Sequence, residues 1–463
     1  MPESRHLGES DSLAARVWRS IFRGPVLPRS DRERKWIVFN TLLLHLRPVR
    51  VPASTLRYTH TFGLGGMSLT LALLLMGTGA LLMFAYEPSP AGAHASIAGL
   101  EADVSFGRLV RSVHHWSANL IVVVIALHML RVFLTGAFRG LRQFNWIVGL
   151  ALLACVLTSN FTGYLLPWDQ RSYWAVTIVT GMLEYVPALG GWLQRAVRGG
   201  AEIGTPTLIV FYALHTTLVP VALVGLMALH FWRVRKAGGV VRPDPPSGSA
   251  AAHTEHVLFL PHLLVREVAV ALALVACVLV AAMLFPAALG EPANPGMSPN
   301  PAKAPWYFMG FQELLLHFDP VFAVLVMPLA GLAGLLMLPY LRCGAAPQGR
   351  WFLSARGRRT ALAAALLGLV ATPVWIALDE RAAHAGPWLS GVPKVLSTGV
   401  LPFAILLGAL AGFAAILKRR HGAATAEAIQ AVFVLLAVAF AILTLTGVWF
   451  RGEGMALTWP WGL

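Results

Sequence analysis

The stretch RLVRSVHHWSANLIVVVIALHMLRVFLTGAF (residues 108–138) carries, among its three histidines, two that are widely spaced, His114 and His128, inside one long apolar run. A run of this length and composition predicts a helix that crosses a membrane. A second apolar run, residues 206–231, also carries two, His215 and His230. An ionisable side chain inside a bilayer is costly and indicates a functional site. These four histidines are therefore the first candidates for the chemistry of the chain.

The separation within each pair places both histidines on nearly one face of a helix. His114 and His128 are 14 residues apart, and His215 and His230 are 15 apart. At about 100° per residue, the 14-residue step ends about 40° short of four whole turns and the 15-residue step about 60° beyond them. The two histidines of each pair are therefore roughly 21–22 Å apart along the helix axis. Because both runs cross in the same direction, His114 is expected to face His215 near the outer surface, and His128 to face His230 near the cytoplasm. Two bis-histidine haem sites fit this pattern; four histidines that bond neighbouring helices are the alternative.

The composition is that of a membrane protein. Of 463 residues, 57% are hydrophobic and 12% are charged, with a mean hydropathy of +0.67, whereas soluble domains carry roughly 25% charged residues. We predict an all-α, polytopic transmembrane helix bundle of about nine spans, with a four-helix di-haem bundle in the N-terminal half. The predicted spans are residues 64–86, 113–134, 146–166, 206–231, 264–285, 320–341, 360–378, 397–417 and 427–450.

Basic loops predict the orientation of these spans. The net charge is +15, but the basic residues lie mainly in loops that share one side, as the positive-inside rule requires, so no nucleic-acid partner is expected. We predict an integral protein of a bacterial inner membrane, with a cytoplasmic N-terminus and a periplasmic C-terminus. Residues 12–22 are either a short amphipathic surface helix or a disordered tail. The basic loops are residues 139–142, 233–236, 342–359 and 418–420.

The chain divides into four predicted parts. A cytoplasmic segment (1–56) precedes a four-span di-haem domain (57–236), and a cytoplasmic linker (237–262) leads to a domain of about five spans (263–463). Three cysteines are isolated, and neither CxxC nor CxxCH occurs. This excludes a covalent c-type haem by that motif and any cysteine metal site.

Glycines on the neighbouring spans repeat the 14-residue spacing. Bare backbone at two depths would let haem planes approach closely, although glycine is common in membrane helices. Arg111 and Arg131 each lie three residues from a candidate ligand and are candidates to pair with haem propionates; interfacial snorkelling is the alternative. The glycines are Gly65 and Gly79 on the first span, and Gly149 and Gly163 on the third.

Together these residues resemble the cytochrome b subunits of bc-type complexes. The resemblance covers roughly residues 55–345 and is greatest to the plastoquinol-oxidising branch of chloroplasts and cyanobacteria, which shares the 14-then-15 spacing but splits the two halves into separate chains. It rests on residues 108–138, TGYLLPWDQRSYWAVTIVTG (162–181), FYALHTTLVP (211–220) and ALHFWRVRK (228–236).

The resemblance implies a function in membrane electron transfer. It implies two non-covalent b haems, an outer one on His114 and His215 and an inner one on His128 and His230. It also implies a Rieske iron–sulfur partner, a c-type cytochrome and a homodimer. Quinol (menaquinol or ubiquinol) would be oxidised at the outer face, with one electron passing to the Rieske cluster and one to the b haems. The second electron would reduce quinone near the cytoplasm, and the reaction would be coupled to proton translocation.

Three features depart from the family pattern. The plastoquinol branch tethers an extra c-type haem to a cysteine where this chain has Gly63, so no covalent haem is expected. The family's outer quinol loop carries Pro-Glu-Trp-Tyr, whereas AKAPWYFMGFQELL (302–315) has Ala304 and Pro305 where proline and glutamate are expected. The C-terminal part of the family has three or four spans, while five are predicted here.

The missing glutamate requires another proton acceptor, because quinol oxidation releases protons. Glu313 is seven residues after Trp306 and would lie two turns along the same helical face. We predict Glu313 as the acceptor in a site with Trp306 and Tyr307, and a structural carboxylate is the alternative. Lys303 and His317 are weaker candidates.

An inner quinone site is predicted at the cytoplasmic ends of the fourth and fifth spans. Arg233, His262 and Glu267 lie there, and Glu267 in LLVREVAV sits where relatives place an acidic quinone ligand. Interfacial charges with no role in catalysis are the alternative for all three.

Two other functions compete with the one that the resemblance implies. A di-haem quinol dehydrogenase that does not bifurcate would not need the Pro-Trp-Tyr loop or the PWDQ segment (167–170). A histidine-relay transporter would show inverted repeats and broken helices, and the last five predicted spans carry no spaced histidine pairs.

Overall fold

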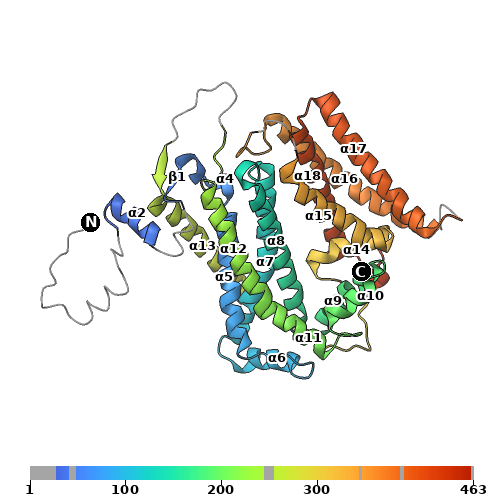
Figure 1. Cartoon of the computed structure of the whole chain (residues 1–463). Helices are drawn as coiled ribbons and strands as arrows, with labels where there is room; N and C mark the ends of the chain where they lie inside the picture. The colour runs from blue at the N-terminus through green and yellow to red at the C-terminus, as the bar shows by residue number, and fades with distance from the viewer. Residues whose placement is uncertain are drawn as a thin grey trace.

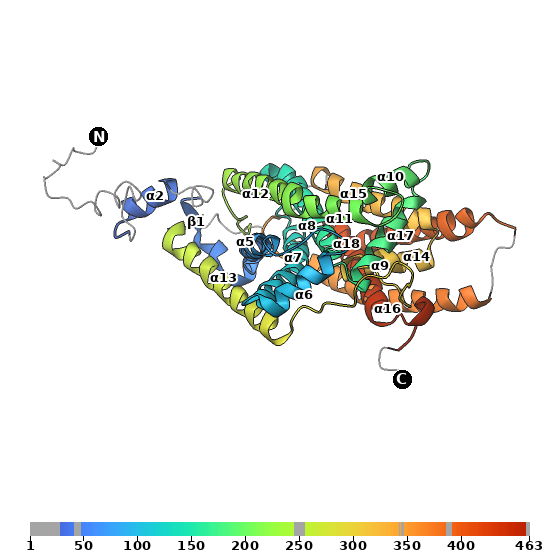
Figure 2. The ribbon, with the colours of Figure 1, turned by 90° about the horizontal axis from the view of Figure 1, so that it is seen from below.

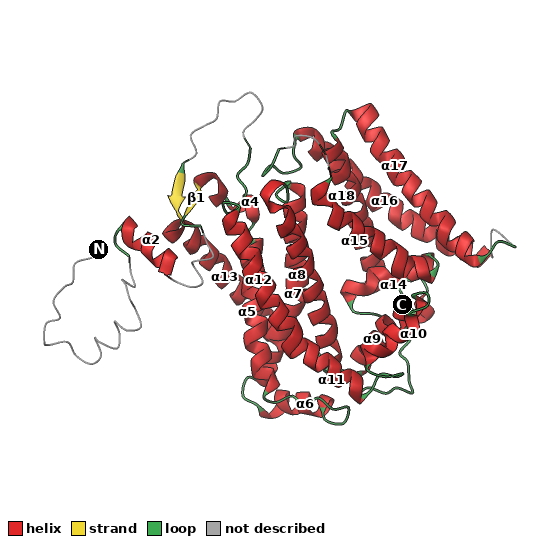
Figure 3. Ribbon diagram, in the orientation of Figure 1, coloured by secondary structure: helices red, strands yellow, loops and turns green. Residues whose placement is uncertain are grey.

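The computed structural model describes residues 28–40, 48–244, 255–341, 343, 347–385 and 391–459, so the predicted surface helix at 12–22 lies outside them. The described chain is almost entirely helical (Figure 3). It contains nine helices long and apolar enough to cross a membrane, which confirms the polytopic helix bundle. They are α5 (Leu64–Met83), α7 (Gly107–Leu134), α8 (Gln143–Leu165), α11–η4–α12 (Thr205–Lys236), α13 (Phe259–Leu284), η6–α15–η7 (Phe322–Tyr340), α16 (Ala355–Ala385), η8–α17 (Val395–His421) and α18 (Thr425–Trp449).

Short elements occupy the connections between spans. At one end of the bundle, β1 (Arg50–Pro52) pairs antiparallel with β2 (His256–Leu258) and so joins the N-terminal segment to the linker before α13. At the other end, four short helices lie between spans (Figure 1). They are α6 (Ala93–Asp103), α9 (Gln170–Met182), α10 (Gly190–Arg198) and α14 (Met309–His317).

The PWDQ segment has a structural explanation. The Asp169 carboxylate accepts a hydrogen bond from Ser172 N at 2.8 Å, and Ser172 Oγ accepts one from Asp169 N at 3.1 Å. This reciprocal capping box starts α9. The second carboxylate oxygen of Asp169 accepts a hydrogen bond from Gly290 N at 3.0 Å. Asp169 therefore fixes α9 against the loop that leads to the Pro-Trp-Tyr residues.

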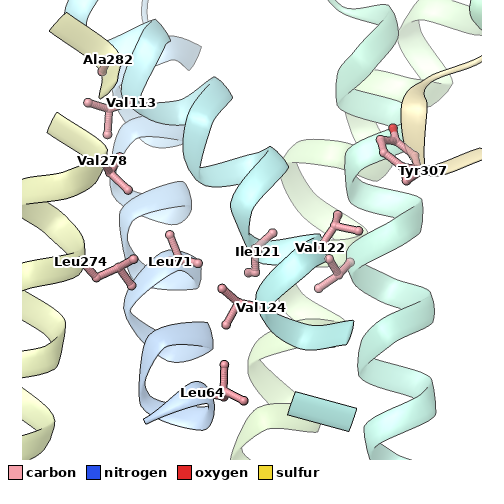
Figure 4. Packing of buried hydrophobic residues seen from close by; sticks show 11 residues of the cluster. Leu64, Leu71, Val113, Ile121, Val122, Val124, Leu274, Val278, Ala282 and Tyr307 are labelled. Atoms are coloured by element: carbon pink, nitrogen blue, oxygen red, sulfur yellow. The ribbon is translucent and has the colours of Figure 1, made fainter. Parts of the chain in front are cut away.

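The N-terminal half is a bundle of α5, α7, α8 and α12, with α13 packed against α5 and α7 (Figures 1 and 2). Its apolar core lies between α5, α7 and α13, as Figure 4 shows. Leu71 of α5 is fully buried between Ile121 and Val124 of α7 and Leu274 and Val278 of α13. Helices that pack this closely hold each side chain at a fixed depth and rotation.

A π-helical turn, Leu214–Leu218 (η4), contains His215. Such a turn accommodates one residue more than an α-helical turn and is common at functional sites. From sequence, the 15-residue step from His215 to His230 is out of phase with the 14-residue step on α7. Because η4 accommodates the extra residue, His215 and His230 face the same side of their helix, as His114 and His128 do on α7. The regular helix assumed from sequence is therefore corrected at this turn.

The last span is central to the C-terminal half. Helix α18 packs against both α14 and α16, whereas η8–α17 lies at the edge of the molecule (Figures 1 and 2). Two glycines allow α18 to approach α14. A Cβ at Gly310 would lie 2.7 Å from the Phe440 ring, and one at Gly447 would lie 2.7 Å from Met309 Cε.

Replacing Gly310 with alanine tests this contact. We expect Gly310→Ala to destabilise the protein by about 1–3 kcal/mol, because the methyl group would be forced into a packed interface. The matched control is Gly331→Ala in α15, where nothing lies within 4 Å of the added Cβ. Thermal midpoints of the purified protein should fall for the first variant only. Equal midpoints for both variants would show that α18 does not press on α14 at this position.

Candidate functional site

One large cavity follows the N-terminal bundle and contains the predicted ligands. Its volume is about 1290 Å³. A pocket for one small molecule typically has a volume of about 300–1,000 Å³. The cavity is therefore large enough for more than one bound group. The lining includes all four predicted histidines and all four predicted glycines, His114, His128, His215, His230, Gly65, Gly79, Gly149 and Gly163.

The histidines meet in the pairs predicted from sequence. The ring centroids of His114 and His215 are 6.1 Å apart, and those of His128 and His230 are 6.5 Å apart. An ion bonded to two imidazole nitrogens at about 2 Å each would separate the centroids by roughly 6 Å, since each nitrogen lies about 1 Å from its ring centre. Both separations thus fit iron held between two imidazoles, as in bis-histidine haem ligation.

Hydrogen bonds orient the outer pair of rings. Thr78 Oγ1 lies 2.9 Å from His114 Nδ1 and donates its own hydrogen to Leu74 O, so it accepts from the imidazole. His215 Nδ1 donates to Ser159 O at 2.9 Å. A ring whose Nδ1 is held as a donor presents its Nε2 lone pair to a metal. In the inner pair, His230 Nδ1 is buried and has no partner among the described residues.

Each glycine of the predicted set faces one histidine of the pairs. The sequence prediction placed bare backbone against haem planes, and the structure shows the histidine rings next to this bare backbone. At Gly163 an added Cβ would overlap the His215 ring, whereas the other three positions leave more room. An added Cβ would lie 3.3 Å from His114 Cε1 at Gly79, 3.5 Å from His128 Cε1 at Gly65, and 4.0 Å from His230 Cε1 at Gly149.

The two arginines predicted to meet propionates differ in their free donors. Both line the cavity. Arg111 pairs with Glu101 and donates to Ala287 O at 2.8 Å and Ala288 O at 3.0 Å. Arg131 donates from Nε to His60 O at 2.9 Å, while its buried Nη2 has no partner in the described chain. Arg131 is therefore the better candidate for an anionic group inside the cavity.

The residues predicted for the inner quinone site separate in the structure. Glu267 lines the cavity together with Arg266, which donates to Leu56 O at 2.8 Å. Arg233 and His262 are not among the lining residues. The guanidinium of Arg233 instead lies over the Phe144 ring, 4.7 Å from its centroid.

At the other end of the cavity, the Pro-Trp-Tyr loop contacts α7. Trp306 Nε1 donates to Asn119 Oδ1 at 2.7 Å, and both Asn119 and Tyr307 line the cavity. The Tyr307 hydroxyl is buried and has no hydrogen-bond partner among the described residues. Burial raises the pKa of Tyr307 far above its ordinary value, so the phenol remains protonated and can donate a hydrogen bond.

Gln312 was not predicted from sequence but holds this loop in shape. Its Oε1 accepts from Ala304 N at 2.7 Å, and its Nε2 donates to Ala302 O at 3.0 Å. A glutamine in a short amphipathic run gives no sequence signal for this role, because both contacts depend on the turn of the chain at Trp306.

Glu313 does not line the cavity. It is fully buried, and its carboxylate accepts hydrogen bonds from Arg451 Nη2 at 2.6 Å and Arg451 Nε at 3.1 Å. Lys303 donates from Nζ to Val448 O at 2.9 Å. The roles predicted for these two residues in quinol chemistry therefore stay predictions. Arg451 itself was missed, because nothing in the sequence indicates which carboxylate a single arginine after the last span will meet.

Comparisons with known proteins agree with this geometry. A family model described as Cytochrome b/b6/petB matches residues 50–238. Cytochrome b6 of Chlamydomonas reinhardtii is 42% identical over 175 residues, which are 38% of this chain and 81% of that protein. Cytochrome b6 of Tupiella akineta is 45% identical with the same coverage. A solved structure titled "Hyperthermophilic respiratory Complex III" covers 83% of this chain and 90% of its own, at a TM-score of 0.60 and 22% identity, and so shares the fold.

Alanine at the two glycines of α8 should affect the two histidine pairs unequally. We expect Gly163→Ala to displace His215 and to weaken or lose the outer haem, whereas Gly149→Ala should leave the inner haem in place. Redox titration of haem b absorbance in the purified complex resolves the two sites. Gly77→Ala, where nothing lies within 4 Å of the added Cβ, is the control. Identical spectra for Gly163→Ala and wild type would refute the close approach of His215 to this backbone.

Proposed function

The chain belongs to the cytochrome b/b6 family, whose members bind b-type haems, and from this membership we propose that it is the di-haem subunit of a bc-type quinol oxidoreductase. The observation that carries the proposal is the pair of histidine contacts. Two imidazole pairs, each spaced for one metal ion, lie in a single cavity within an array of apolar helices. A structural role for four such histidines would not require this spacing twice.

The chain's own residues would bind and orient the haems. His114 and His215 would hold the outer haem, and His128 and His230 the inner one, with Arg131 offering its free Nη2 to a propionate. Thr78 and the Ser159 carbonyl would keep the outer imidazoles in the tautomer that binds iron. When bound, the haems supply one-electron transfer across the membrane, while the protein sets their orientation and electrostatic surroundings.

Quinol would be oxidised at the end of the cavity that Tyr307 lines. The free Tyr307 hydroxyl is the donor available to a quinol oxygen, and the bond from Trp306 to Asn119 fixes the loop beside α7. One electron would leave to a Rieske iron–sulfur partner and the other would enter the haem pair, with protons released on the outer side. The sequence prediction that Glu313 accepts protons from quinol, with Lys303 as a weaker candidate, stays a prediction, because neither residue lines the cavity.

Quinone would be reduced at the opposite end. Glu267 lines the cavity there and is the residue of the predicted inner set that can reach a ligand inside it. Arg233 stacks on Phe144 outside the cavity, so its predicted contribution would be to the surrounding charge.

The remaining assignments follow from family membership and loop charge. We propose a bacterial inner membrane protein with a cytoplasmic N-terminus, working with a Rieske protein and a c-type cytochrome in a homodimeric complex that uses menaquinol or ubiquinol. A di-haem quinol dehydrogenase that passes both electrons onward is the competing function.

Oxidant-induced reduction of haem b tests bifurcation. The purified complex is supplied with quinol and an inner-site inhibitor and then pulsed with oxidant while haem b absorbance is recorded. We expect transient reduction in the wild type and none in His215→Leu, which lacks one outer ligand. His421→Gln, at an exposed position, is the control that should behave as wild type.

The competing function predicts a different record. If both haems are present and a competent Rieske partner is bound, but haem b stays unresponsive to the pulse, bifurcation is refuted. The chain would then act as a simple quinol dehydrogenase.

A further inference from the structure

A cluster of charged side chains with a buried centre lies outside the cavity, where α14, α16 and the segment after α18 meet. Arg451 and Glu313 form its centre, and neither side chain is exposed to solvent. Arg451 also pairs with Glu380 of α16. His317 bridges Glu313, at 3.3 Å from Nε2, and Asp379, at 2.7 Å from Nδ1. The cluster thus contains three carboxylates and two basic groups from three separate parts of the chain.

The segment after α18 is also bonded to the loop that precedes Trp306. Lys303 donates from Nζ to Val448 O at 2.9 Å, and Gly454 N donates to Asn300 Oδ1 at 2.6 Å. Arg451 closes the same segment on itself by donating to Met455 O at 3.0 Å. The chain from 300 to 313 is therefore held by residues 448–454 at both of its ends.

The residues between these two anchors are those of the outer quinol site. Trp306 and Tyr307 lie between Lys303 and Glu313, and Gln312 bonds the loop to the first turn of the helix that follows. Any shift of α14 relative to α18 would consequently move Tyr307 in the cavity and strain the bond from Trp306 to Asn119.

We propose that Arg451 is a positioning residue for the outer quinol site, which it acts on through its ion pair with Glu313. This inference rests on the proposed function, because it presumes that quinol binds beside Tyr307. Removing the guanidinium would leave the buried Glu313 carboxylate without the group that donates to both of its oxygens, a state that proteins avoid by local rearrangement. In this assignment Glu313 anchors α14 and does not accept protons from quinol.

The protonation states of the cluster support an anchoring role. Burial by itself would raise the pKa of Glu313, but hydrogen bonds from His317 and Arg451 outweigh it and hold the pKa below its ordinary value. A carboxylate stabilised in its ionised form is a poor acceptor for protons released nearby. Burial would likewise lower the pKa of His317, yet the bonds to Asp379 and Glu313 raise it. Both pKa shifts favour the charged forms of Glu313 and His317, as an ion-paired anchor requires.

Neutralising the partners singly and together separates anchoring from proton acceptance. In the purified complex, with a soluble short-chain quinol as substrate, we expect Arg451→Gln to raise KM for quinol about tenfold or more while kcat changes less. The double variant Glu313→Gln/Arg451→Gln should lie closer to wild type than Arg451→Gln, because it no longer leaves the fully buried Glu313 carboxylate without Arg451. Arg451→Lys should restore most of the affinity.

The controls and contrary outcomes are specific. Arg381→Gln, at an exposed arginine close to Asp379 and Glu380 in sequence, should match wild type. If Arg451→Gln leaves KM unchanged, or if the double variant shows the same loss of kcat as Glu313→Gln alone, the positioning role is refuted. Wild-type complex with both haems that oxidises no quinol would instead refute the proposed function on which the inference rests.

The pH dependence of KM gives a second readout. The pKa of His317 is raised in the folded protein by its bonds to Asp379 and Glu313. The stabilisation that the charged imidazole gives to the cluster is therefore complete below the unfolded-state pKa. It is lost as pH rises through the folded-state pKa. Glu313 and Asp379 bond to the His317 ring, and Arg451 and Glu380 complete the charged cluster around them. KM should therefore rise with pH in the wild type but not in His317→Gln. The same alkaline rise in both proteins would contradict the assignment.

Discussion

The structure depends on one constraint, that two imidazoles face each other at each of two depths in an apolar bundle. Imidazoles in such surroundings are costly unless they are ligated or hydrogen-bonded. The chain satisfies the constraint with helices on both sides. The π-helical turn at His215 brings a 15-residue spacing into phase with a 14-residue one, and Gly163 removes the side chain that would occupy the position of the His215 ring. Helix packing, glycine placement and the irregular turn are thus consequences of the same geometric requirement.

The second organising feature is the way in which the C-terminal spans support the outer site. The Pro-Trp-Tyr loop has Ala304 and Pro305 where the family resemblance predicts proline and glutamate. The carboxylate of Glu313 bonds to Arg451 and does not line the cavity. Helix α18 packs along α14 through Gly310 and Gly447, and the segment beyond it bonds to the loop. The last span is therefore more than lipid-facing surface, since it links the loop to the rest of the C-terminal half.

The sequence predicted those parts of the fold that follow from regular periodicity. Nine apolar runs and two pairs of spaced histidines required only helix length and 3.6-residue geometry, and both appear in the structure. Features that depend on irregular backbone were not predictable. The π-helical turn at His215 and the loop contacts of Gln312 are of this kind, because neighbouring elements create them.

Pairing between charged residues far apart in sequence was equally inaccessible. Arg111 and Arg131 look equivalent in the sequence, because each lies three residues from a paired histidine. In the structure Arg111 donates to the carbonyl of Ala287, whereas Arg131 Nη2 has no partner among the described residues. Glu313 was placed on the correct helix, but which face of α14 turns to the cavity depended on where α18 packs.

The most direct test of the two-site geometry is the haem b content of the purified polypeptide, measured as pyridine haemochrome against protein concentration. Two haems per chain are expected in the wild type, and one in a variant that lacks either ligand of a single pair. One haem or none in fully folded wild-type protein would contradict the assignment of His114, His128, His215 and His230 as two bis-histidine sites.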